Sequence, residues 1–136
     1  MPLALRVDTL WKCYAAGVRG CSARAWVLRG LSLHVQAGER IAVVGGAGTG
    51  KSTLAACILG HRRPDAGLVE LTGPLVVRDG TDAVLADAHA GLATIILARN
   101  LGSLRGWADR VLLLRDGRLH ATALQGARRV AEHALR

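Results

Sequence analysis

The segment Gly45–Ser52, with the sequence GGAGTGKS, constrains this chain more than any other. It matches the pattern G-x-x-x-x-G-K-[ST] at each fixed position. The apolar run Arg40–Gly45 before it is typical of a buried parallel strand. The residues Lys51–Leu59 after it have helical spacing, and Gly60 is expected to stop the helix. A strand, a glycine-rich loop and a helix in this order predict an α/β core with an anion site at the loop.

The chemistry of phosphate binding explains why these residue types occur in this order. Glycines let the backbone curve closely around a diphosphate with its N–H groups pointing inward, and the helix adds its positive N-terminal end. Lys51 would reach the β- and γ-phosphates, and the Ser52 hydroxyl would bind Mg²⁺. We therefore expect a nucleoside triphosphate with Mg²⁺ here. The residues expected to hold it are Gly45, Gly46, Ala47, Gly48, Thr49, Gly50, Lys51, Ser52 and Thr53.

Length and composition limit the other classes of function. The chain has 136 residues, 51% of them hydrophobic, and we expect a single domain over 1–136. The net charge is +8, but the arginines are dispersed along the chain and are read as a solvated surface. Because only one tyrosine is present, the sequence lacks an interleaved set of base-stacking aromatics, and no nucleic acid partner is expected.

The cysteines and the apolar runs indicate the cellular compartment in which the protein is expected. Cys13, Cys21 and Cys57 form an odd set without a C-x-x-C pair, which indicates neither a disulfide framework nor a zinc site. The longest apolar runs, such as Leu92–Ala98, are far shorter than the ~20 residues of a bilayer span. We expect a cytoplasmic protein with no membrane span of its own.

Strand and helix signals alternate along the rest of the chain. Asp116-Gly117 is a hairpin signal, Thr72–Asp82 reads as a loop with one short apolar stretch at Leu75–Val77, and Ala127–Leu135 is expected to be a helix. The alternation predicts a three-layer α/β domain with an antiparallel portion near the N-terminus. The strands are expected at Leu3–Leu10, Val27–Val35, Leu68–Leu71, Ala83–Leu85, Ala93–Ala98, Val111–Leu114 and Leu119–Ala121.

The residues around the loop resemble the ATP-binding cassette (ABC) ATPases. Leu28–Val35 followed by Gly38–Gly45 is similar to the family's strand pair, and Ala108–Leu119 is similar to its C-terminal strand pair. The segment Leu10–Tyr14 resembles the one whose aromatic side chain stacks on adenine. The resemblance implies a P-loop NTPase three-layer sandwich with an ABC-type core, ATP as the nucleotide, and Tyr14 against its base.

The middle of the chain departs from the family's pattern. Gln36 and Gln125 are the only glutamines, so the family's Q-loop is missing, as is any LSGGQ-like signature. The resemblance therefore implies a core without the helical subdomain. Val84–Ala93 is similar to the family's LLDEPTAGLD segment, with Ala86 in place of the Mg²⁺-orienting Asp and Asp87 in place of the catalytic Glu.

These departures predict impaired hydrolysis. Asp87 is one methylene shorter than Glu, and a misplacement near 1 Å can cost about 10²-fold in rate. Arg99 stands where the family has its switch His. An alternative register makes Asp87 the Mg²⁺ residue. Asp79 or Asp82 would be a substitute, but both fall in a predicted loop with no apolar strand before it.

Two functions from different classes follow. The first is an ABC-type ATPase domain that hydrolyses ATP slowly or only with a partner, as the ATPase component of a transport system beside a membrane. The alternative is a catalytically silent ATP-binding subunit that regulates or assembles with a complete ABC protein. The resemblance implies a full-length ABC ATPase or a permease as partner, the former in a heterodimer. A decayed gene copy is the third interpretation.

Overall fold

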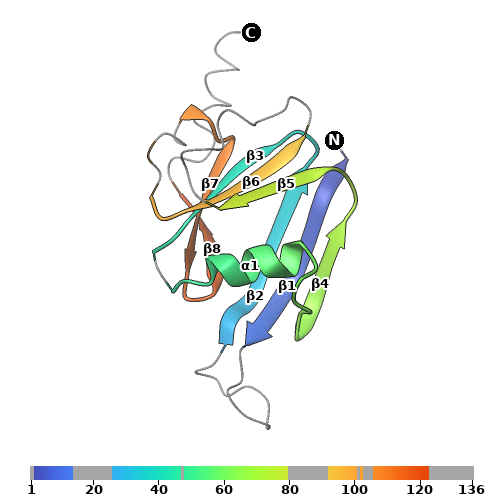
Figure 1. Ribbon diagram of the computed structural model, residues 1–136, viewed down its shortest axis with the longest axis vertical. Coiled ribbons are helices and arrows are strands. Elements are labelled where there is room, and N and C mark those ends of the chain that lie inside the picture. The colour runs from blue at the N-terminus through green and yellow to red at the C-terminus, as the bar shows by residue number, and fades with distance from the viewer. Residues whose placement is uncertain are drawn as a thin grey trace.

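The computed structural model describes residues 2–13, 26–46, 48–79, 92–100, 102 and 106–122. These residues form a three-stranded sheet, a five-stranded sheet and one α-helix that lies across the face of the smaller sheet (Figure 1). The expected α/β P-loop architecture with an antiparallel N-terminal portion is confirmed. Within the described residues no helical subdomain accompanies it.

The smaller sheet is antiparallel and has the order β2-β1-β4. Its strands are β1 (Leu3–Cys13), β2 (Trp26–Gln36) and β4 (Ala66–Leu71). Side chains of β2 alternate between buried and exposed along much of its length, as expected for a strand with one face on a core. β4 is an edge strand, and its Leu68 and Leu71 are exposed.

The larger sheet has the order β5-β6-β3-β7-β8 and is parallel except for its last strand. Its strands are β3 (Arg40–Val44), β5 (Leu75–Asp79), β6 (Ala93–Ala98), β7 (Arg110–Arg115) and β8 (Arg118–Ala121). Every residue of β6 is buried, because this strand is covered on both faces. β3 lies at the centre, between β6 and β7, so the loop that follows β3 leaves the middle of the sheet.

The helix α1 (Lys51–Ile58) follows that loop, as predicted. The Gly60 amide bonds to the Cys57 carbonyl at 3.3 Å and the His61 amide to the Ala56 carbonyl at 2.8 Å. Gly60 has a φ of +81°, so these bonds form the Schellman ending that favours glycine. The predicted helix extended to Leu59, but Leu59 is the residue that follows the last helical turn, and it is 47% exposed.

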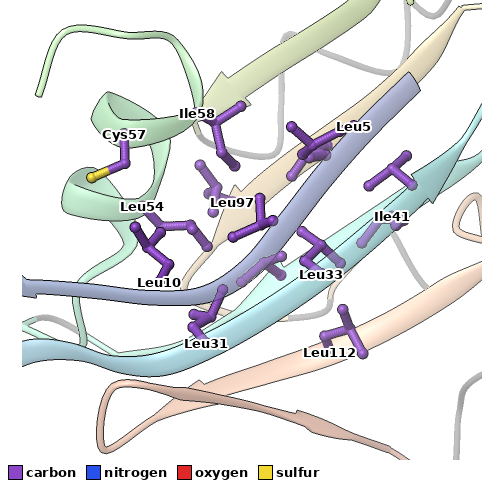
Figure 2. Close-up of a cluster of buried hydrophobic side chains, with 14 of the residues drawn as sticks. Leu5, Leu10, Leu31, Leu33, Ile41, Leu54, Cys57, Ile58, Leu97 and Leu112 are labelled. Carbon is purple, nitrogen blue, oxygen red and sulfur yellow. The ribbon is translucent and has the colours of Figure 1, made fainter. Parts of the chain in front are cut away.

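The main core lies where α1 and both sheets meet. Figure 2 shows Leu54 and Ile58 of α1 beside Leu10 of β1 and Leu97 of β6. All four side chains are at most 1% exposed. This shared core fixes the position of α1, and hence of the loop before it, relative to both sheets.

The prediction of a loop over Thr72–Asp82 is wrong for its middle part. Residues 75–79 form β5, which pairs in parallel with β6 from Leu75 against Ala93 to Asp79 against Leu97. The apolar stretch Leu75–Val77 packs against the core through Leu75 and Val77. Because β5 is an edge strand, it tolerates the two exposed polar residues that end it, which hid it from the sequence pattern.

The hairpin at Asp116-Gly117 is confirmed. Both residues have positive φ, +54° and +76°, which is the signature of a type I′ turn between β7 and β8. The predicted strand Ala83–Leu85 and the predicted helix Ala127–Leu135 lie outside the described residues.

The cysteines differ from expectation. Cys13 is disulfide-bonded, a bond that the odd number of cysteines and their spacing did not indicate. Cys57, a residue of α1, has a free thiol and is buried. No helix among the described residues has the length and apolar character needed to cross a membrane.

Candidate functional site

Gly45 is the point at which the glycine-rich loop leaves the larger sheet. Its amide donates a hydrogen bond of 2.9 Å to the carbonyl oxygen of Ala98, the last residue of β6. A Cβ atom at Gly45 would lie 2.6 Å from Thr49 Oγ1 and 2.9 Å from the carbonyl oxygen of Leu114 in β7. Since a backbone oxygen cannot rotate away, only glycine fits here.

The later glycines are needed for other reasons. Gly48 and Gly50 have φ values of +77° and +100°, the left-handed region that favours glycine. Gly50 is also the N-cap of α1, and its carbonyl accepts the first helical hydrogen bond, from the Leu54 amide at 2.9 Å. A Cβ atom at Gly46, by contrast, would meet nothing within 4 Å. Three of the four described glycines of the loop are therefore structurally required, and Gly46 is not required by packing.

Lys51 lies across the opening of the loop. Its Nζ donates hydrogen bonds to the carbonyl oxygens of Gly45 and Gly46, the second at 2.8 Å. Thr49 Oγ1 donates to the same Gly46 carbonyl at 2.8 Å. The ammonium is thus held where an anion bound by the loop would meet it, and a charged phosphate oxygen is a stronger acceptor than a carbonyl.

Ser52 and Thr53 occupy the first turn of α1. The Ser52 side chain is exposed, so its hydroxyl is accessible to a cation, whereas the Thr53 side chain is buried. The amides of a first helical turn point out of the helix end, where they favour an anion. Thr53 would therefore contribute through its backbone.

Several predicted site residues cannot be compared with the structure. Tyr14, Ala47, Asp82 and Asp87 lie outside the described residues. Their roles stay predictions.

Asp79 has a different position from the one the sequence indicated. It is the last residue of a parallel strand, β5, and it is exposed. It pairs with Leu97 of β6, which pairs in turn with Val43 of β3. Asp79 therefore lies at the carboxyl edge of the sheet, where the glycine-rich loop also begins. The apolar run ending in a carboxylate was the signal that could have found it.

Arg99 follows the last residue of β6 and is exposed. The preceding residue, Ala98, accepts the hydrogen bond from the Gly45 amide. The structure therefore brings the arginine that replaces a histidine in the resemblance to the start of the loop.

A hollow of about 660 Å³ lies against the loop. Gly48 and Thr49 form its loop wall, Trp26 and Arg29 come from β2, and Arg115, Arg118 and His120 come from the β7–β8 hairpin. In Figure 1 this hairpin lies beside the N-terminal end of α1. We call this site the basic hollow. Sequence reasoning missed it, because its basic residues are far apart in the chain.

The sequence model of the family described as ABC transporter matches residues 28–98, which include most of β2 and all of β3, the loop, α1 and β6. The chain belongs to this family. The methionine import ATP-binding protein MetN of Bordetella pertussis is 34% identical over 97 residues, which are 71% of this chain and 25% of that protein. The lipoprotein-releasing system ATP-binding protein LolD of Chromohalobacter salexigens is 38% identical over 82 residues, 60% of this chain and 33% of that protein.

Solved structures of the family share the fold. The structure of CbiO1 from Clostridium perfringens, part of the ABC transporter complex CbiONQ, has a TM-score of 0.76 at 13% identity, covering 98% of this chain and 92% of that one. A nucleotide-free ATP-binding cassette from an ABC transporter has a TM-score of 0.73 at 13% identity, covering 98% and 96%. The chain spans a third or less of the length of the curated relatives named above.

Proposed function

We propose that this ABC-family chain binds ATP with Mg²⁺ at the loop Gly45–Ser52. One observation carries the proposal, namely the Lys51 ammonium held over the Gly45 and Gly46 carbonyls at the mouth of the loop. A loop whose glycines are required by contact and by φ, followed by a helix start, is a cradle for phosphate.

Each residue in this proposal has a separate task. Lys51 neutralises the β- and γ-phosphates, while the amides of the loop, including those of Gly48 and Gly50, hold the phosphate oxygens. Ser52 offers its exposed hydroxyl to Mg²⁺, which would neutralise phosphate charge. Tyr14 is proposed against the adenine. The Ser52 hydroxyl and the phosphate oxygens are oxygen donors, which suit Mg²⁺.

Hydrolysis is proposed to be slow or dependent on a partner. Asp87 remains the proposed base, and Asp79, at the carboxyl edge of β5, is the alternative acidic group. Hydrolysis needs a hydrogen-bonding side chain, here a carboxylate, that orients water at the γ-phosphate. Arg99 does not supply the neutral imidazole that the resemblance places at the end of β6.

The relatives support a place in transport. They are named as ATP-binding proteins of import and lipoprotein-releasing systems. We propose that residues 1–136 act as one ATP-binding domain, at the cytoplasmic side of a membrane complex. The partners would be a permease or a complete ABC ATPase, the latter in a heterodimer that supplies the signature this sequence lacks.

A second candidate function is a silent ATP-binding subunit. It is favoured by the sequence between the loop and β6, which contains no glutamine and no signature-like segment. In this interpretation ATP binding itself, without turnover, regulates the assembly with a complete ABC protein.

Nucleotide turnover separates the two functions. ADP release would be measured with purified protein, Mg²⁺ and ATP, for the native chain and for Asp87→Ala and Asp79→Asn. A slow rate that either variant removes supports the ATPase. A background rate in all three, with a rise in melting temperature on adding ATP, supports the silent subunit. No effect of ATP on rate or melting temperature rejects both.

A further inference from the structure

The basic hollow beside the loop has a charge that the proposed ATP site does not use. Arg29, Arg115 and Arg118 line it together with His120, and among the described residues Asp116 is the one acidic residue in the lining. These basic residues come from β2, β7 and β8, so folding gathers charges that are distant in the sequence.

Arg115 and Arg118 face each other across the hairpin. They are direct partners in the register of β7 and β8, on either side of the Asp116-Gly117 turn, and both are exposed. Like charges directly opposite each other in an antiparallel pair destabilise it. No ion pair in the part of the chain that the structure describes involves either arginine. The repulsion between the two arginines therefore lowers the stability of the hairpin when no ligand is bound.

The hairpin is held firmly despite this cost. The Arg29 amide donates a hydrogen bond of 2.9 Å to the Gly117 carbonyl, which ties the turn to β2. A Cβ atom at Gly117 would lie 2.7 Å from the carbonyl oxygen of Val27, so the turn is pressed against that strand. The two guanidinium groups thus start from fixed backbone positions, which reduces the entropy lost when an anion binds.

We propose that the basic hollow is a second anion site that takes a phosphate or diphosphate group on Arg115 and Arg118, next to the loop but separate from Lys51. Guanidinium groups match phosphate oxygens with paired hydrogen bonds. An anion between the two arginines removes their repulsion, so binding also stabilises the hairpin. The phosphate comes either from a nucleotide that extends over Gly48 and Thr49 or from a separate inorganic anion.

The test uses melting temperature and tryptophan fluorescence, to which Trp26 in the lining of the hollow contributes. Inorganic pyrophosphate and ATP, each without Mg²⁺, are titrated at low ionic strength. The variants are Arg115→Gln/Arg118→Gln, Lys51→Ala and the control Arg62→Gln/Arg63→Gln, which removes the same charge from an exposed pair outside the hollow.

Two results support the site and identify the source of the phosphate. If pyrophosphate raises the melting temperature of Lys51→Ala, but no longer does so when Arg115→Gln/Arg118→Gln is added to that variant, a separate anion is the ligand. If only ATP acts, and its affinity falls about tenfold or more in Arg115→Gln/Arg118→Gln but not in the control, the nucleotide supplies the phosphate. An ATP affinity that Lys51→Ala leaves unchanged counts against the proposed ATP site and leaves the basic hollow standing.

The proposal is overturned if the anions raise the melting temperatures of the native chain, Arg115→Gln/Arg118→Gln and the control equally. It is also overturned if neither anion changes the melting temperature of the native chain. If the double variant does not fold, the single variant Arg118→Gln replaces it. Without an anion its melting temperature should equal or exceed that of the native chain, because the repulsion with Arg115 is removed. A lower melting temperature would contradict the proposal.

Discussion

Arg110 donates two hydrogen bonds to the carboxylate of Glu39, from Nε to Oε2 at 2.8 Å and from Nη2 to Oε1 at 3.2 Å. The Glu39 side chain is only 5% exposed and that of Arg110 is 20% exposed. The pair joins the turn before β3 to the first residue of β7. It therefore fixes, at the amino ends, two adjacent strands whose carboxyl ends frame the glycine-rich loop.

Replacing Glu39 should be costly. Glu39→Ala leaves the Arg110 guanidinium without its main partner in a largely buried place, and we expect a loss of about 2–4 kcal/mol in the free energy of unfolding. Urea denaturation measures it. Glu70→Ala, at an exposed position of β4, is the control and should change stability by less than about 0.5 kcal/mol. Equal losses in the two variants would show that the pair has no special role.

Gly45 and Gly46 form a matched test of the loop. Gly45→Ala forces a Cβ atom to 2.9 Å from the Leu114 carbonyl, whereas at Gly46 a Cβ atom meets nothing within 4 Å. We expect Gly45→Ala to lower stability by about 1–3 kcal/mol and to weaken ATP binding strongly, since the loop must shift. Gly46→Ala should keep the native stability. Denaturation and calorimetric titration check both, and a reversed order would contradict the geometry.

Asp79 should contribute to the gain in ATP affinity that Mg²⁺ brings. Because it ends β5 at the carboxyl edge of the sheet, Asp79→Asn is expected to reduce the gain in ATP affinity that Mg²⁺ brings by several-fold. ATP binding without Mg²⁺ should be unchanged. Titrations with and without Mg²⁺ separate the two, and Glu70→Gln serves as the control. An unaltered Mg²⁺ gain in Asp79→Asn would remove Asp79 from the site and leave Asp87 as the candidate.

Cys57 gives a prediction that depends on pH. Burial on the core-facing side of α1 raises the pKa of its thiol, with smaller contributions from nearby charges. The folded chain therefore favours the protonated form, so this contribution to stability is present below the ordinary thiol pKa and is lost as the pH rises through the raised value. Alkylation of Cys57 by iodoacetamide at pH 8, followed by mass spectrometry, should be slow in the folded chain and fast in urea. Equal rates would contradict the burial.

Much of the fold follows from local pattern. The run before the loop, the helix from Lys51, the Gly60 stop and the Asp116-Gly117 turn all have chemistry that acts within a few residues, and each was predicted correctly. β5 was missed because its five residues end in Arg78 and Asp79. Its strand conformation depends on pairing with β6, which is a contact distant in the sequence.

The candidate site was likewise predictable from the sequence only in part. The motif predicted the loop, and the structure adds why Gly45 and Gly50 are required and where Lys51 lies. The basic hollow was not predictable, because Arg29 and Arg118 become neighbours only when the Arg29 amide bonds to the Gly117 carbonyl. The disulfide at Cys13 was likewise beyond a spacing argument.

The position of the Lys51 ammonium is tested most directly by calorimetric titration of ATP with Mg²⁺ into the native chain, Lys51→Ala and the control Arg63→Ala. The native chain and Arg63→Ala should bind one ATP with equal affinity. Lys51→Ala should bind at least about tenfold more weakly, since a hydrogen-bonded charge is lost from the phosphate. Equal affinity in all three, or no heat of binding from the native chain, would contradict the account.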